Sequence, residues 1–356
     1  AGNPPQYNKS VREFDIVTLD RVKRIEVKED YSVWRSYALK NKVHPSILAY
    51  LDLKTEQFYK IEATADGYAF VTARGWEDLS RILWMYEESG LGITVEFLFE
   101  YLQHEEVARD FLGFYQLCKK IKEEYGLMQI LEGTRGEEKL EKEILKLKET
   151  EFDARVAILT FLSDGIHQKI ESYDKKEQKV QIQYQEAKRL LEQLENKKET
   201  DRFSELLGRK IEQEKHAFLV KKEQGLLTKE EKWEKEQQRE WLEELKNAWK
   251  QSGTKSGTEQ ELIRTCFNQK REAQKQEKEK MQEILERAFE FVGHAFGDGQ
   301  ESAMFVERLS MDECILKFIQ KNGCSAYQKA GACIQAEERE AELQNEIQNL
   351  TNFLQK

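Results

Sequence analysis

A repeat of apolar side chains every seven residues is the feature that most restricts how this chain can fold. The first series consists of Ile166, Tyr173, Val180, Ala187 and Leu194, and a companion series of Ile170, Glu177, Tyr184 and Leu191. Two apolar positions in each heptad draw one stripe along a helix, and that stripe needs another helix to cover it. The pattern therefore predicts a coiled-coil seam over about four heptads, with Glu177 as its polar exception.

Further long helices are expected on the C-terminal side of this repeat. Charged residues make up 35% of the 356 residues and the chain has only 3 prolines, a composition that suits long, solvated helices. Capping boxes mark helix starts at Thr228 and Thr258. The Gly- and Ser-rich residues 252–257 between these helices read as a flexible hinge. We expect the helix before the hinge and the helix that returns towards Phe291 to form an antiparallel hairpin.

The N-terminal third has a different pattern, with enough large apolar residues for a compact core. Residues 22–27 suit a strand, Pro45 opens a helix, and 61–71 suit a small β-hairpin with its turn at Asp66-Gly67. Thr94 can cap another helix. A Gly-rich break at 133–136 separates this unit from the long helices.

A small helical module is expected at the C-terminal end. Ser310 with Glu313 has the spacing of a capping box, and Gly323 marks a helix stop. The last helix carries an apolar stripe of Leu343, Ile347, Leu350 and Leu354. The chain as a whole divides into four regions, 1–30, 31–130, 137–292 and 293–356, and its fold class is mainly α.

Charge and cysteine content exclude several classes of function. The net charge of −10 argues against nucleic-acid binding, which needs basic patches. Five cysteines and five histidines have no metal-ligand spacing, so we expect free thiols, no metal site and a cytoplasmic protein. No apolar run reaches the roughly 20 residues that span a membrane. Because the sequence begins with Ala1, we expect it to be a piece of a longer protein.

Three polar residues have both a functional and a plain structural interpretation. Asn3, in Gly2-Asn3-Pro4, could hold a water near a γ-phosphate, although these residues also form ordinary turns. Arg21, in a Leu-Asp-Arg sequence, could stabilise charge on a transferred phosphoryl group or form a surface ion pair. Arg74, in Thr-Ala-Arg-Gly-Trp before an amphipathic helix, could contact a phosphate or simply cap and pack.

The order of these three motifs resembles the second half of the MoxR-like AAA+ ATPase family. The resemblance covers about residues 1–130 and includes His44-Pro45, Leu51-Asp52-Leu53 and the stretch 70–83. It implies that 1–30 is the end of an AAA+ α/β core and that 31–130 is the α-helical lid. The stretch 296–301 also resembles C-terminal tails of this family in anaerobic Gram-positive bacteria.

The resemblance also implies roles for the three polar residues. Asn3 corresponds to the sensor-1 asparagine, Arg21 to the arginine finger, with Arg12 as the alternative, and Arg74 to the sensor-2 arginine. The parent protein would be a hexameric ring that uses ATP and Mg²⁺ to remodel a protein client, for which a von Willebrand A-type protein is a plausible candidate.

Two parts of the family pattern are missing. The sequence has no Gly-x-x-x-x-Gly-Lys-Ser/Thr phosphate loop and no Walker B run, both of which precede sensor 1 in the family. We therefore expect this chain alone neither to bind ATP tightly nor to hydrolyse it. The alternative hypothesis is a non-enzymatic scaffold, in which the helices from about 137 to 356 dock a partner or another subunit.

Overall fold

The computed structural model describes residues 16–21, 23, 27–65, 67–195, 203–223, 225, 227–251 and 259–332. In these ranges the chain is mainly helical with one β-hairpin, as the sequence predicts. Several predicted features lie outside the described residues: Asn3, Arg12, most of the strand at 22–27, the hinge at 252–257, the cap at Thr258 and the stripe at 343–354. None of the described helices is long and apolar enough to cross a membrane.

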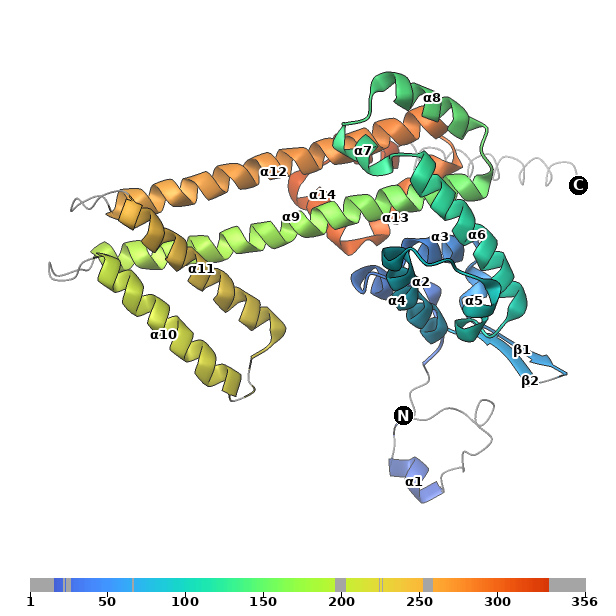
Figure 1. The fold of residues 1–356 in the computed structure, drawn as a ribbon, viewed down its shortest axis with the longest axis horizontal. Coiled ribbons are helices and arrows are strands. Elements are labelled where there is room, and N and C mark those ends of the chain that lie inside the picture. The colour runs from blue at the N-terminus through green and yellow to red at the C-terminus, as the bar shows by residue number, and fades with distance from the viewer. Residues whose placement is uncertain are drawn as a thin grey trace, which may run out of the picture.

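The N-terminal third of the chain forms a helical body (Figure 1). A short helix α1 precedes it and spans Ile16–Arg21. The helices of the body are α2 Tyr31–Lys40, α3 Pro45–Leu53, the 3₁₀ turn η1 Thr55–Gln57, α4 Ala73–Ser89, α5 Val95–Tyr101 and α6 Glu105–Glu124. The strands β1 Lys60–Thr64 and β2 Gly67–Val71 pair antiparallel, which confirms the predicted hairpin. Gly67 has a φ of +137°, a value that side-chain-bearing residues rarely adopt.

Two helices far longer than the rest extend from the body as an arm (Figure 1). They are α9, Phe152–Glu195, and α12, Glu259–Phe296. The remaining elements are α7 Leu127–Glu132, α8 Glu137–Lys148, α10 Phe203–Glu223, α11 Lys229–Gln251, α13 Gln300–Met311 and α14 Glu313–Asn322. Helices α10 and α11 lie at the end of the arm that is remote from the body (Figure 1).

The two long helices run antiparallel to each other, and this corrects one expectation. Lys176 forms an ion pair with Glu277 at 3.0 Å, and the ring of Tyr184 lies 5.4 Å from that of Phe267. The main partner of α12 is thus α9, whereas α11 packs chiefly on α10. The predicted hairpin of α11 with α12 holds in part: Glu244 of α11 pairs with Lys270 of α12 at 2.9 Å, but α12 packs mainly on the long stripe of α9.

The heptad repeat of α9 is buried in its first half and shifts in its second. Ile166, Ile170 and Tyr173 are buried, and so is Ala187 of the first series, but Tyr184 of the companion series is 54% exposed. In its place Gln183 and Leu190 are buried, one residue earlier than the repeat predicts. The change in register coincides with a change of neighbours, because the far end of α9 packs on α10 and α11 as well as α12.

Two separate hydrophobic cores hold the molecule together. The larger one joins the body to the near half of the arm and to α13 and α14, with Trp76, Phe111, Leu159, Leu285 and Phe305 among its buried residues. The smaller one lies at the remote end and contains Leu190, Phe203, Leu207, Trp241 and Leu245. Residues from three of the four predicted regions therefore contribute to the larger core.

Helix α14 begins differently from the prediction. Asp312 is its N-cap, and its Oδ1 accepts hydrogen bonds from the backbone N–H groups of Cys314 and Ile315 at 3.0 and 3.1 Å. Ser310 lies in the last turn of α13, where its hydroxyl donates to the carbonyl oxygen of Val306. The predicted capping box at Ser310 is therefore wrong: the helix begins two residues later, and the carboxylate of Asp312 accepts from its first N–H groups.

Candidate functional site

Arg74 occupies the first turn of α4, and its neighbours fix that turn. The preceding Thr72 is the N-cap, and its hydroxyl accepts a hydrogen bond from Gly75 N at 3.3 Å. Trp76 is fully buried, and its indole Nε1 donates to the carbonyl oxygen of Gln57 at 3.1 Å. The side chain of Arg74 is exposed and forms no ion pair with any described residue. This turn thus presents a guanidinium to solvent from a rigid base.

Gly75 allows α4 to approach the end of α5 closely. A β-carbon at this position would lie 2.6 Å from the carbonyl oxygen of Tyr101, closer than any packed side chain tolerates. Beside this contact, Phe70 N of β2 donates to Gln103 O at 3.0 Å. The β-hairpin, the first turn of α4 and the end of α5 are therefore in contact beside the turn that carries Arg74.

The other predicted site residues are not brought to this turn. Arg21 is the last residue of α1 and is exposed, and α1 lies apart from α4 in Figure 1. Asn3 and the alternative finger Arg12 lie outside the described residues.

A cleft of about 700 Å³ lies where the body meets the arm. One wall comes from the end of α2 and the turn after it, together with α3 and α4, and the other from α9. Its lining residues are Leu39, Asn41, Lys42, Val43, Leu48, Glu77, Ser80, Arg81, Trp84, Asp164, His167, Gln168 and Glu171. On α4 and α9 these residues recur at spacings of three and four, so each helix gives one face to the cleft.

The cleft contains a histidine whose orientation is fixed by an acid. His167 Nδ1 lies 2.7 Å from Oδ2 of Asp312, the N-cap of α14, and this hydrogen bond raises the pKa of His167 above its ordinary 6.5. One turn earlier on α9, burial raises the pKa of Asp164 to about 6. Two titratable groups with raised pKa values thus line one wall, and shifted pKa values also occur in functional sites.

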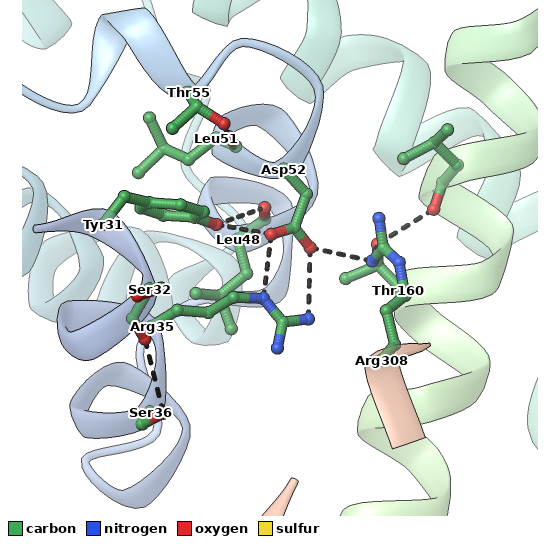
Figure 2. Close-up of polar contacts among 11 residues, drawn as sticks. Tyr31, Ser32, Arg35, Ser36, Leu48, Leu51, Asp52, Thr55, Thr160 and Arg308 are labelled. Carbon is green, nitrogen blue, oxygen red and sulfur yellow. Dashed lines mark hydrogen bonds and ion pairs between the residues drawn. The ribbon is translucent and has the colours of Figure 1, made fainter. Parts of the chain in front are cut away.

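A buried group of charges joins the body to the C-terminal module (Figure 2). Asp52 of α3 accepts hydrogen bonds from Arg35 Nε at 2.8 Å and from the Tyr31 hydroxyl at 2.6 Å. Its other oxygen lies 3.0 Å from Nη1 of Arg308, which also donates to Thr160 of α9. Two guanidinium groups therefore share one carboxylate, and the pKa of Arg308 is lowered because the side chain is buried.

The sequence did not reveal the cleft or the Asp52 group. Asp52 appeared only within the Leu51-Asp52-Leu53 motif, and Arg308 carried no local signal. The i, i+3, i+4, i+7 spacing of Asp164, His167, Gln168 and Glu171 on α9 was visible in principle, but it is also the spacing of any solvated helix face.

Comparisons of the chain with protein-family models, with curated proteins and with solved structures found no match.

Proposed function

We propose that this chain is the C-terminal part of a MoxR-like AAA+ ATPase, in which residues 31–130 act as the lid. The observation that supports this most directly is the setting of Arg74. It projects from a turn fixed by Thr72, Gly75 and Trp76, and it has the place in the motif order that the family gives to sensor 2. An exposed guanidinium on a rigid base suits contact with a nucleotide phosphate, because it is pre-organised for ionic hydrogen bonds.

In this proposal the lid reports the state of a nucleotide to the rest of the molecule. Arg74 contacts the phosphates bound by its own subunit, Asn3 orients the attacking water, and Arg21 reaches into the site of the neighbouring subunit of a hexameric ring. The phosphate loop that holds ATP and the acidic residues that hold Mg²⁺ have no counterpart in these 356 residues. Activity therefore requires a longer protein that supplies them.

The test uses the complete gene product that contains this sequence. Arg74→Ala should lower ATP hydrolysis by about 100-fold, because a preorganised donor to the transition state is lost. Arg109→Ala is the matched control, since Arg109 is an exposed arginine of the same region that pairs with Glu105 on its own helix. Arg21→Ala should abolish hydrolysis and spare ATP binding, measured with a fluorescent ATP analogue. Undiminished hydrolysis by the Arg74 variant, or a gene product without a phosphate loop, would refute the proposal.

The arm favours a second function, docking of a protein partner, which is compatible with the first. Helices α9 and α12 carry the α10–α11 hairpin away from the body, and the hairpin has its own small core. Leu219 of α10 is 54% exposed, so the hairpin offers an apolar contact. The client of the proposed ATPase, for which a von Willebrand A-type protein is the candidate, would bind here.

A pair of leucine variants separates docking from hydrolysis. Leu219→Ser in the complete gene product should weaken binding of a purified von Willebrand A-type protein from the same organism, and should leave ATP hydrolysis unchanged. The control Leu145→Ser alters an exposed leucine on α8, of which 64% is accessible. Equal binding by both variants would exclude this part of the hairpin as the docking surface.

A further inference from the structure

The cleft between α4 and α9 is chemically divided. Leu39, Val43, Leu48 and Trp84 form an apolar and aromatic part, whereas Glu77, Asp164 and Glu171 contribute carboxylates. A cavity of about 700 Å³ with this division suits a ligand that has a charged head on an apolar stem.

Of the three carboxylates that line the cleft, one forms no ion pair with a described cation. Glu77 is paired with Arg81 on its own helix. Glu171 lies 3.3 Å from Lys42 and 2.8 Å from Lys175. Asp164 forms no ion pair with any described residue; its recorded hydrogen bond is from the Gln168 amide at 2.7 Å.

The charges around Asp164 leave its carboxylate without a full counter-charge. Burial raises its pKa to about 6, and the nearby positive charges of His167 and of Lys122 on α6 only partly oppose that effect. His167 is itself held by Asp312 at 2.7 Å, so its charge is largely neutralised. The two cations that line the cleft, Lys42 and Arg81, are engaged with Glu171 and Glu77. An incoming anion would meet no free cation, whereas an incoming cation would complete the pairing of Asp164.

We propose that this cleft binds an alkylammonium group, with the charged nitrogen at the Asp164 carboxylate and the apolar stem along Leu39 and Trp84. The ligand is a lysine side chain of a partner polypeptide or a free aliphatic amine, since both share this chemistry. Because the cleft is formed jointly by the body and the arm, the bound amine contacts both. The proposal is independent of the ATPase assignment and holds for this chain alone.

Binding is tested on the complete 356-residue chain by saturation-transfer NMR, with titration to saturation. The first probe is the tripeptide acetyl-Gly-Lys-Gly-amide, and its control has norleucine, which keeps the stem but lacks the charge. We expect the lysine peptide to bind at least about tenfold more tightly than the norleucine peptide, as a hydrogen bond to a charged group requires. Equal binding of the two peptides would refute the ionic basis of the site.

Two carboxylate variants locate the binding on the molecule. Asp164→Asn should weaken binding of the lysine peptide by about tenfold or more. Asp174→Asn is closely matched, because Asp174 also accepts a hydrogen bond from a glutamine four residues later on α9, at 3.0 Å, but lies outside the cleft. Circular dichroism of both variants checks the fold. Loss of binding in both variants, or in neither, would overturn the assignment to this cleft.

Two further arms identify the source of the amine and the titrating group. Spermidine replaces the peptide in one arm: tighter binding of spermidine identifies a free polyamine, and tighter binding of the peptide identifies a polypeptide lysine.

In the other arm the pH is lowered through about 6, where Asp164 takes up a proton and affinity should fall. This fall should persist in His167→Gln. A peptide affinity that does not change with pH would contradict the role of Asp164.

Discussion

The carboxylate of Asp52 on α3 lies 3.0 Å from Nη1 of Arg308 on α13, two helices near opposite ends of the chain. Arg308 is only 5% exposed, and Arg35 approaches the same carboxylate from α2. Nη2 of Arg308 is buried without a hydrogen-bond partner among the described residues. One acid therefore compensates two buried guanidinium groups, and the N-terminal body is tied to the C-terminal module through it.

Loss of this acid should destabilise the whole molecule. Asp52→Ala leaves Arg35 and Arg308 buried without their shared counter-charge, so we expect the free energy of unfolding to fall by about 3–5 kcal/mol. The measurement is urea unfolding followed by circular dichroism. The exposed pair of Arg109 with Glu105 provides the comparison, and its removal should cost under about 1 kcal/mol. A similar decrease in the free energy of unfolding for the two changes would show that the buried Asp52 group stabilises the fold no more than an exposed pair.

Even the smallest side chain at position 75 should destabilise the fold. Gly75→Ala places a β-carbon 2.6 Å from the backbone oxygen of Tyr101, and the relief of that overlap should cost about 1–3 kcal/mol. Gly113→Ala is the control: Gly113 lies inside α6 with no atom within 4 Å of an added β-carbon, so alanine should stabilise the helix by up to about 1 kcal/mol. Thermal unfolding measures both. A neutral Gly75→Ala would mean that α4 and α5 are not closely packed.

Stability should fall with rising pH through the titration of His167. The native chain holds this proton more tightly than the unfolded chain, because Asp312 accepts a hydrogen bond from the imidazolium. The contribution is complete below the ordinary pKa of 6.5 and is lost as the pH rises through the higher native value. Asp164, with its pKa raised to about 6, acts in the same direction at lower pH.

Urea midpoints measured from about pH 6 to pH 9 should therefore decline, and His167→Gln should make this decline shallower. His216→Gln, at an exposed position on α10, should leave the decline unchanged. If the His167 and His216 variants behave alike, the pair with Asp312 does not contribute to stability.

The remote core should unfold without the main one. Leu245 is fully buried in the small core of α10, α11 and the far end of the arm. Leu245→Ala should cost that core about 2–5 kcal/mol. Hydrogen exchange should then accelerate in α10 and α11 and stay unchanged in α3 and α6, because the two cores share no described buried residue. Uniform acceleration would show one cooperative unit.

Local signals in the sequence predicted local structure well. The cap at Thr94, the reciprocal hydrogen bonds of Thr228 with Glu231 and the hairpin of β1 with β2 are all confirmed. Each depends on residues a few positions apart, so the relevant physics is contained in the sequence window. The capping box at Ser310 is wrong because α13 continues through Ser310 to Met311, and the next helix is capped by Asp312.

Long-range pairings were not predictable in the same way. A heptad stripe shows that α9 needs a cover, but it does not say which helix supplies it; α12 takes that place and also contacts α11 through Lys270 and Glu244. The Asp52 group and the cleft depend on residues of α3, α9 and α13 that meet only after folding. For the site itself, the sequence places Arg74 correctly at the start of a helix, while its role and those of Asn3 and Arg21 stay predictions.

The antiparallel pairing of α9 with α12 makes the reach of the molecule adjustable. Because the chain leaves along one helix and returns along the other, seven residues inserted at facing positions in both would carry the remote hairpin outward by about 10 Å. Neither hydrophobic core would lose a residue. The length of these two helices alone therefore sets the distance between the body and the remote hairpin.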